Sequence, residues 1–465
     1  MKLAERPRYR RSPAFVQDAL VSAHGAGRLA RNGRRVRRVL AELMESQWFS
    51  EAEFAELQRE RLSLLIRHCY ETVPYYRQVM RELGLTPDDI RTPLDLPKLP
   101  LLTKEIVRTR GKELLSECLA KGESHWSTSA GTTGAPLETL HDARSMVFEQ
   151  AMVQRQWRIA GLPPRCRRAT LRDDRVVPAE QIRPPFWRVN RPESQLIMST
   201  FHLSQRTAPA FVEALRRFRP RALEARPSAA FFLAQEMQAV GETIQLDCVL
   251  SGSEPIYPGH RETIEKAFDC KVFDSYRLSE RVSYAFECPE HSGLHVAPEY
   301  GVTEFIGDVH GLKEIVGTSL NNFAMPLLRY RTGDYVRPLD DDCPCGRKMQ
   351  LLGPVEVQVG GSLRRQDGSF LPFSLVSHAV TGLEHIRKTQ LVQESLDWLV
   401  VRLVPGERFS GDDRERLIGS LRQQMGSGVR IDLELVEDIE RQDNGKYRWV
   451  VSRAKEPAAA EVLVE

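Results

Sequence analysis

The chain has 465 residues, of which 41% are hydrophobic and 28% charged, and its formal net charge is +3. This length exceeds one ordinary core and predicts two or three domains, while the small net charge excludes a general polyanion binder and predicts no nucleic-acid partner. The sequence has no run of about 18 apolar residues, no apolar secretory core near its start and only eight cysteines. We therefore expect neither a membrane span of about 20 residues nor a disulfide scaffold, but a cytoplasmic protein.

The first 45 residues are a basic arm that we expect to be helical in part. A solvated basic helix or a frayed tail is the simplest interpretation of this arm. Contact with an anionic lipid surface, a nucleic acid or an acidic partner is the alternative. Its arginines are Arg6, Arg8, Arg10, Arg11, Arg28, Arg31, Arg34, Arg35, Arg37 and Arg38.

The sequence after the basic arm has the periodicity of helices. Apolar residues recur at helical spacing over residues 48–69, and Ser50 with Glu53 resembles a capping box at the start of that helix. A proline-rich connector occupies residues 87–100, and residues 103–115 predict another capped helix. A further helix is expected from about 142 to 160.

Residues 127–137 read Ser-Thr-Ser-Ala-Gly-Thr-Thr-Gly-Ala-Pro-Leu, a pattern suited to wrapping a phosphate. Glycines let the backbone approach an anion, and consecutive amides of such a loop form an anion-binding nest. It is not a Walker loop, because no Gly-Lys-Ser/Thr follows at the required spacing. A flexible polar linker is the alternative. The hydroxyls and glycines concerned are Ser127, Thr128, Ser129, Thr132, Thr133, Gly131 and Gly134.

The middle of the chain alternates predicted strands and helices, which is typical of a largely parallel sheet with helices on both faces. The expected strands are 195–198, 248–250 and 271–273, and the expected helices are 211–218, 229–240 and 259–267. A β-rich stretch follows at 301–335. From residue 353 the pattern changes to a compact α+β unit.

The predicted fold is therefore α/β, with a large N-terminal domain of mostly parallel sheets flanked by helices and a small α+β C-terminal domain. We expect a basic arm at 1–45, the large domain at 46–353 and the small domain at 354–465.

Polar segments follow several of the predicted strands, at the sheet edge where α/β proteins bind ligands. Gly252-Ser253-Glu254 follows one strand, and Tyr276 to Glu280 follows the next. Asp334 comes after a tight turn and suits two ribose hydroxyls. Asn444-Gly445-Lys446 is a turn that ends in a cation. For each segment alone, an ordinary surface turn is the simpler interpretation.

The order of these segments resembles the adenylate-forming acyl-CoA synthetase superfamily. Residues 72–77 (Thr-Val-Pro-Tyr-Tyr-Arg) and 99–104 (Leu-Pro-Leu-Leu-Thr-Lys) narrow the resemblance to the phenylacetate–CoA ligase family, including its capsule-biosynthesis-associated branch. It runs from about residue 45 to residue 446.

The resemblance implies an ATP-dependent enzyme that couples a small carboxylic acid to AMP and transfers the acyl group to a thiol, coenzyme A, with a C-terminal domain that acts as a mobile lid. Transfer to an amine or sugar acceptor, or a degenerate relative that binds a nucleotide without turnover, are the alternatives. The acid, the acceptor and the oligomeric state stay open.

The resemblance also implies a role for each matching residue. The glycine loop would hold the β- and γ-phosphates of ATP, Asp334 the ribose, and Lys446 the forming acyl phosphate. Glu280 would bind Mg²⁺ with Thr132, and Tyr276 would stack on adenine. Catalysis would depend on Lys446, Glu280 and Thr132. The implied nucleotide-binding residues are Ser129, Gly131, Thr132, Thr133, Gly134, Gly252, Ser253, Glu254, Tyr276, Glu280 and Asp334.

The sequence departs from the family pattern at three ligand-facing positions. Ala135 replaces a loop lysine, and Arg277 replaces the glycine that follows the aromatic residue. The hinge reads Gly353-Pro354-Val355-Glu356 and lacks the usual arginine. These changes put an ordinary catalytic rate in doubt.

Two short cysteine and histidine segments predict a structural zinc site. Cys288, His291, Cys343 and Cys345 supply four ligands, which suits closed tetrahedral zinc. Similar clusters in the phenylacetate ligase family favour this interpretation, and reduced cysteines that never meet are the alternative. His295 is interpreted as an interior histidine, with a place in the acyl pocket as its alternative.

Overall fold

The computed structural model of the 465-residue chain divides into two compact units. Unit 1 holds Met1–Val21, Arg167–Val272 and Val355–Glu465, and unit 2 holds Ser22–Cys166 and Phe273–Pro354. The boundary expected at 353/354 stays a prediction. The structure describes residues 3–119, 124–128, 137–172, 174–256, 259–309, 311–358, 362–367, 369–371, 376, 385–406, 408–426, 428–439 and 448–454.

Helices dominate the N-terminal part of the chain. They are η1 (Leu3–Glu5), α1 (Pro7–Arg10), α2 (Ala14–Ser46), α3 (Glu51–Thr72), α4 (Pro74–Glu82), η2 (Pro87–Asp89), η3 (Pro93–Lys98) and α5 (Lys104–Arg110). The predicted capping box of α3 is confirmed, because Ser50 Oγ accepts from the Glu53 amide and Glu53 accepts from the Ser50 amide. None of the described helices is both long and apolar enough to cross a bilayer.

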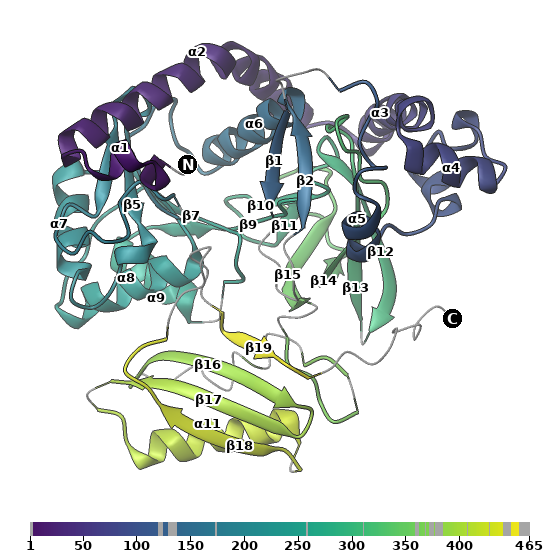
Figure 1. The fold of residues 1–465 in the computed structure, drawn as a ribbon. Helices are drawn as coiled ribbons and strands as arrows, with labels where there is room; N and C mark the ends of the chain where they lie inside the picture. Colours follow the sequence, from purple (N-terminus) through teal and green to yellow (C-terminus); the bar gives the residue numbers. More distant parts are fainter. Residues whose placement is uncertain are drawn as a thin grey trace. The chain divides into compact units, whose positions relative to one another are not determined.

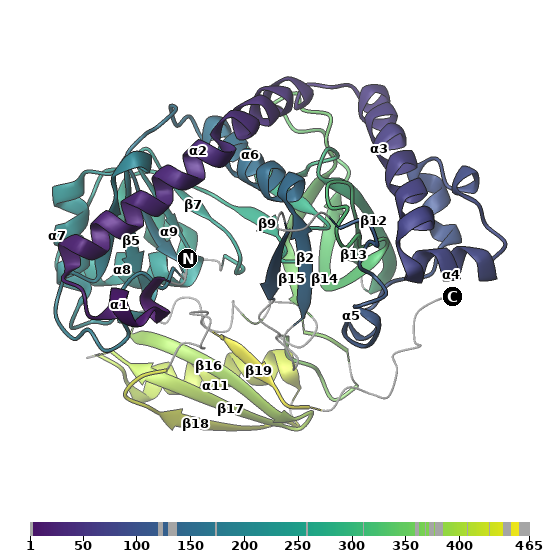
Figure 2. The ribbon, with the colours of Figure 1, turned by 45° about the horizontal axis from the view of Figure 1, so that its top comes forward.

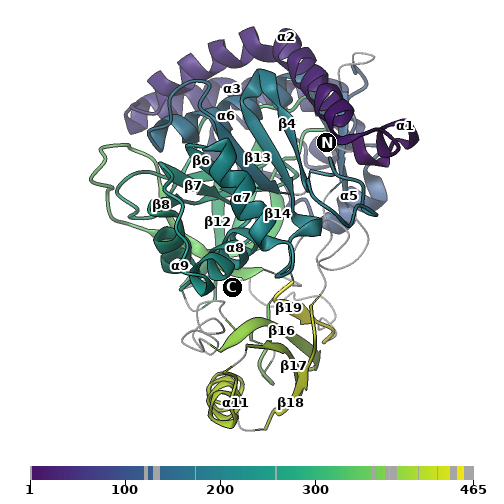
Figure 3. The same cartoon turned by 90° about the vertical axis from the view of Figure 1, so that its left-hand side faces the viewer.

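A six-stranded sheet forms the centre of unit 1, in the order β4-β5-β3-β6-β7-β8. Its recorded pairs β3·β5, β3·β6 and β6·β7 are parallel, which confirms the expectation, and only β4 is recorded antiparallel, to β5. Helices α7, α8 and α9 lie against the sheet (Figure 3). The bounds are β3 (Arg168–Arg172), β4 (Trp187–Asn190), η4 (Arg191–Glu193), β5 (Gln195–Ser199), η5 (Thr200–His202), α7 (Ala208–Phe218), β6 (Ala222–Ala225), α8 (Pro227–Ala239), β7 (Cys248–Ser251), α9 (His260–Phe268) and β8 (Lys271–Phe273).

A seven-stranded sheet follows, in the order β12-β13-β14-β15-β11-β10-β9. Its recorded pairings are antiparallel, so this part of the fold differs from the parallel pattern of unit 1. The bounds are β9 (Ser275–Arg277), β10 (Tyr284–Glu287), β11 (Leu294–Val296), β12 (Gly301–Val309), β13 (Leu312–Ser319), β14 (Tyr330–Leu339) and β15 (Leu351–Gln358). Helix α6 (Ala143–Ile159) lies where the sequence predicted a helix, and the carboxylate of its N-cap residue Asp142 accepts from the Ser145 amide at 2.7 Å.

The C-terminal residues form a four-stranded sheet, β18-β17-β16-β19, with α11 beside it (Figure 1). Leu417 and Leu421 of α11 are fully buried in one cluster with Leu391 and Val401 of the sheet. This is the small α+β part that the sequence predicted. The bounds are β16 (Ile386–Ser395), β17 (Trp398–Pro405), α11 (Gly411–Met425), β18 (Arg430–Leu435) and β19 (Val450–Ser452).

Candidate functional site

Two tyrosine–carboxylate pairs lie together in unit 2. Tyr276 of β9 donates its hydroxyl to Asp334 Oδ2 of β14 at 2.8 Å. Tyr330, at the start of β14, donates to Glu280 Oε1 at 3.0 Å. Three strands separate β9 from β14 in the order of the sheet, so the sheet must curl to bring the first pair into contact.

All four side chains of this cluster are buried, with exposed fractions of 9% or less. Burial, followed by the nearby carboxylates, raises the pKa of Tyr276 and of Tyr330 well above the ordinary value. Both phenols therefore stay protonated and donate to carboxylate oxygens. A carboxylate such as Asp334 suits two vicinal hydroxyls, and one such as Glu280 suits a hard cation.

Close backbone packing positions the segment that carries Glu280. Val282 lies against Gly301 of β12 and Gly317 of β13, and a Cβ added to Gly317 would come 2.8 Å from Val282 O. At Gly301 the added Cβ would overlap the same carbonyl. Only glycine permits this approach, which fixes the segment after β9 against the sheet.

The hydroxyl-rich run lies in the connection of an antiparallel hairpin formed by β1 (Ser124–Thr128) and β2 (Glu138–Asp142). Ser127 pairs with Thr139, and Thr128 pairs with Glu138. Ser129, Gly131, Thr132, Thr133 and Gly134 lie outside the described residues, as do Ala135 and Lys446. Their roles stay predictions.

The Gly252-Ser253-Glu254 segment belongs to unit 1 and follows β7. Ser253 has φ +72°, a left-handed conformation that is uncommon for a non-glycine residue and concentrates at functional sites. Its hydroxyl accepts from Arg172 Nη2 at 3.0 Å. Glu254 contacts the first turn of α8, where it accepts from the Ser228 amide at 3.3 Å and pairs with Arg226 at 3.4 Å.

Arg277, a departure from the family pattern, has an acidic partner on α6. Its Nη1 lies 3.3 Å from Glu149 Oε1, and the two side chains are 18% and 17% exposed. Tyr300 also donates to Glu149, at 2.5 Å. The ion pair offsets the desolvation cost of placing the Arg277 cation beside Tyr276. It also holds the long Arg277 side chain toward α6. The hinge departure Pro354 lies within β15 and is exposed.

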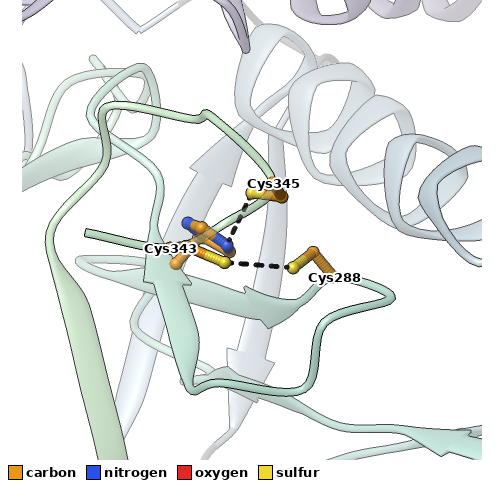
Figure 4. A group of neighbouring side chains, drawn as sticks. Cys288, Cys343 and Cys345 are labelled. Atoms are coloured by element: carbon orange, nitrogen blue, oxygen red, sulfur yellow. Dashed lines mark hydrogen bonds between the residues drawn. The ribbon is translucent and has the colours of Figure 1, made fainter. Parts of the chain in front are cut away.

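Three predicted metal ligands converge in unit 2 (Figure 4). Cys288 follows β10, and Cys343 and Cys345 lie between β14 and β15. The fourth member of the cluster is His295 of β11, and the ligand atoms of all four residues lie within 4.8 Å of one another. His291 was predicted in this place, and the structure corrects that assignment.

The register of the β10–β11 hairpin explains the correction. His295 pairs with Phe286, two residues before Cys288, so alternation places His295 and Cys288 on one face. His291 lies in the turn, where its Nδ1 is 3.2 Å from Glu287 Oε2 and its ring centroid is 4.8 Å from that of Phe273. The sequence analysis missed His295; the alternation of side chains along β10 and β11 is the signal that could have identified it, once the register of the two strands was known.

Two pairs of ligand atoms in this cluster have the spacing of a tetrahedral site. Cys288 Sγ and Cys343 Sγ are 3.6 Å apart, and Cys345 Sγ lies 3.5 Å from His295 Nε2. Tetrahedral zinc with bonds of about 2.3 Å to sulfur and about 2.0 Å to nitrogen places its ligands roughly 3.5–3.8 Å apart. The donor set and its geometry therefore suit zinc with no open coordination position.

Comparison with known proteins finds relatives whose sequences align with most of this chain. Residues 363–453 match the CapK C-terminal domain family. Protein CapK of Staphylococcus aureus is 23% identical over 461 residues, 96% of this chain and 99% of that one. A phenylacetate-coenzyme A ligase of Thermus thermophilus is 25% identical over 434 residues, 86% of this chain and 96% of that one.

A solved structure shares the fold. The structure of 2-hydroxyisobutyryl-CoA ligase with an acyl-AMP aligns with a TM-score of 0.69 at 17% identity, covering 88% of this chain and 91% of that one. This likeness establishes the α/β architecture with its small C-terminal domain.

Proposed function

We propose that this chain, a relative of CapK and of the phenylacetate-CoA ligases over most of its length, activates a carboxylic acid with ATP and transfers the acyl group to coenzyme A. The substrate carboxylate attacks the α-phosphorus, the bond to pyrophosphate breaks, and an acyl-adenylate forms. The thiolate of coenzyme A then attacks the acyl carbon, and AMP leaves. A cytoplasmic location, predicted from the sequence, would supply both ATP and the thiol.

The pairing of Tyr276 with Asp334 beside Glu280 is the observation that carries the proposal. In this assignment the Asp334 carboxylate accepts hydrogen bonds from the ribose hydroxyls, and Tyr276 is positioned by Asp334 to present its ring to the base. Glu280, held by Tyr330, would bind Mg²⁺, which neutralises phosphate charge when bound. The resemblance assigns Gly252, Ser253, Glu254 and the loop at 129–134 to the same nucleotide, and these assignments stay predictions.

Acid-dependent exchange of pyrophosphate into ATP tests the adenylation step. Across a panel of aliphatic, hydroxylated and aromatic acids, we expect exchange with at least one acid. Asp334→Asn should lower that exchange on the order of 100-fold, because it weakens charge-assisted hydrogen bonds to ribose. The exposed Asp308→Asn, in the same unit, should leave it unchanged. Tight ATP binding without exchange for any acid would instead indicate a degenerate relative.

The acceptor is tested by adding coenzyme A to the adenylating reaction. A product with the mass of the acyl-CoA supports transfer to the thiol. An acyl-adenylate that is consumed by an amine or a sugar but not by coenzyme A would replace this part of the proposal with amide or ester formation.

We further infer that the cluster of Cys288, His295, Cys343 and Cys345 holds one structural zinc ion. Protein purified without chelator should contain close to one zinc per chain, and Cys343→Ser/Cys345→Ser should lose it. The control is Cys118→Ser, an exposed cysteine outside the cluster, which should keep its zinc. A wild-type content under about 0.2 zinc per chain would contradict this site, because a structural zinc ion binds tightly enough to stay bound during purification.

A further inference from the structure

Helix α2 carries a concentrated positive charge. Its residues 19–41 contain six arginines and no aspartate, glutamate or lysine. Because the whole chain carries +3 and this stretch alone carries +6, the remaining residues sum to −3. The net positive charge of the protein therefore resides on one helix.

Five of these arginines form an exposed surface, the basic face of α2. In unit 2, one side of the helix packs inward through Val36 and Leu43, both 3% exposed or less. At about 100° per residue, the arginines of the basic face project away from that side. In the described part of the chain, their recorded ion pairs are limited to Arg38 with the exposed Glu42, 3.7 Å apart. The basic face consists of Arg31, Arg34, Arg35, Arg37 and Arg38.

The exposed side chains that precede the basic face on α2 are mostly small or apolar. Ala23, Ala26 and Ala30 are exposed, and Leu20 and Leu29 are 45% and 43% exposed. Nucleic-acid surfaces instead surround their cations with polar donors or stacking aromatics, and residues 19–41 contain no aromatic side chain besides His24. A mixture of arginine, alanine and leucine suits a lipid headgroup layer, which binds cations and accommodates methyl groups.

The basic face occupies residues 31–38 of α2, which is one continuous helix of 33 residues (Figure 2). From these observations we propose that the basic face of α2 docks the protein reversibly on anionic phospholipid membranes. Five exposed arginines give binding that depends on anionic headgroups and weakens with salt.

The test is co-sedimentation of the full chain with phosphatidylcholine vesicles that contain or lack phosphatidylglycerol. The wild type should bind only the anionic vesicles at about 0.05 M salt and dissociate at about 0.5 M. Arg31→Gln/Arg34→Gln/Arg38→Gln should weaken the partition on the order of 100-fold, since each arginine contributes separately. Glutamine keeps the helix propensity of arginine, and an unchanged thermal unfolding midpoint would show that the variant is folded.

The matched control removes the same charge from another exposed helix surface, with Arg414→Gln/Arg416→Gln/Arg422→Gln on α11. This variant should bind anionic vesicles as the wild type does. Equal losses in both triple variants would mean that net charge rather than the basic face governs binding, and would overturn the proposal. So would equal binding to neutral vesicles, or tighter binding to duplex DNA or poly-glutamate than to anionic vesicles.

Discussion

Lys446→Ala is expected to lower acid-dependent ATP–pyrophosphate exchange on the order of 100- to 1000-fold, the loss typical of removing one group that stabilises transition-state charge. Negative charge accumulates on the α-phosphate and the leaving pyrophosphate as the carboxylate attacks. A lysine ammonium directed at that charge stabilises the transition state more than the ground state. The loss should therefore appear in the turnover rate more than in the apparent affinity for ATP.

Two further variants make this result specific. Lys446→Arg keeps the positive charge but changes its shape and should recover part of the exchange. Lys266→Ala removes an exposed lysine from α9 and should behave as the wild type. Exchange by Lys446→Ala at the wild-type rate would remove Lys446 from the mechanism while leaving the assignment of Asp334 to be judged by its own variant.

Glu299→Gln is expected to lower the stability of unit 2 by about 3 kcal/mol, because it leaves a buried guanidinium without its counter-charge. Glu299 Oε1 lies 2.7 Å from Arg155 Nη1, and the two side chains are 1% and 0% exposed. The same oxygen accepts from Ser46 at 2.7 Å, and Arg155 lies over the ring of Phe286. This pair connects α6, α2 and the strand region that carries the cysteine cluster.

Urea denaturation followed by circular dichroism measures the shift in midpoint. Adding Arg155→Met to Glu299→Gln should recover much of the loss, since no unpaired buried charge remains. Glu56→Gln, which breaks an exposed ion pair with Arg59, should leave the midpoint unchanged. A wild-type midpoint for Glu299→Gln would show that the buried pair contributes no net stability.

Local patterns in the sequence predicted much of the fold correctly. The capping box at Ser50 located the start of α3, and the helix expected from about residue 142 matches α6. Capping depends on hydrogen bonds within one turn, so the local sequence contains all its partners. Helix α5 was predicted too long, because it ends at Arg110 while the expectation extended to residue 115.

The candidate site was predictable as a set of residues rather than as an arrangement. The order of motifs along the chain predicted Tyr276, Glu280 and Asp334, but it could not predict that Tyr276 hydrogen-bonds Asp334. That contact depends on the curl of the seven-stranded sheet, which brings β9 to β14 across three intervening strands. Such curvature arises from twist accumulated over many residues and leaves no local pattern.

By itself the sequence determined the element types, the helix starts, the family resemblance and the positive charge of α2. These properties depend on residues close together in the chain or on composition. The tertiary structure alone decided that His295 rather than His291 joins the cysteines, and that Arg277 pairs with Glu149. Both outcomes depend on hairpin register and on packing between distant segments, where the choice among candidate partners is made by geometry in three dimensions.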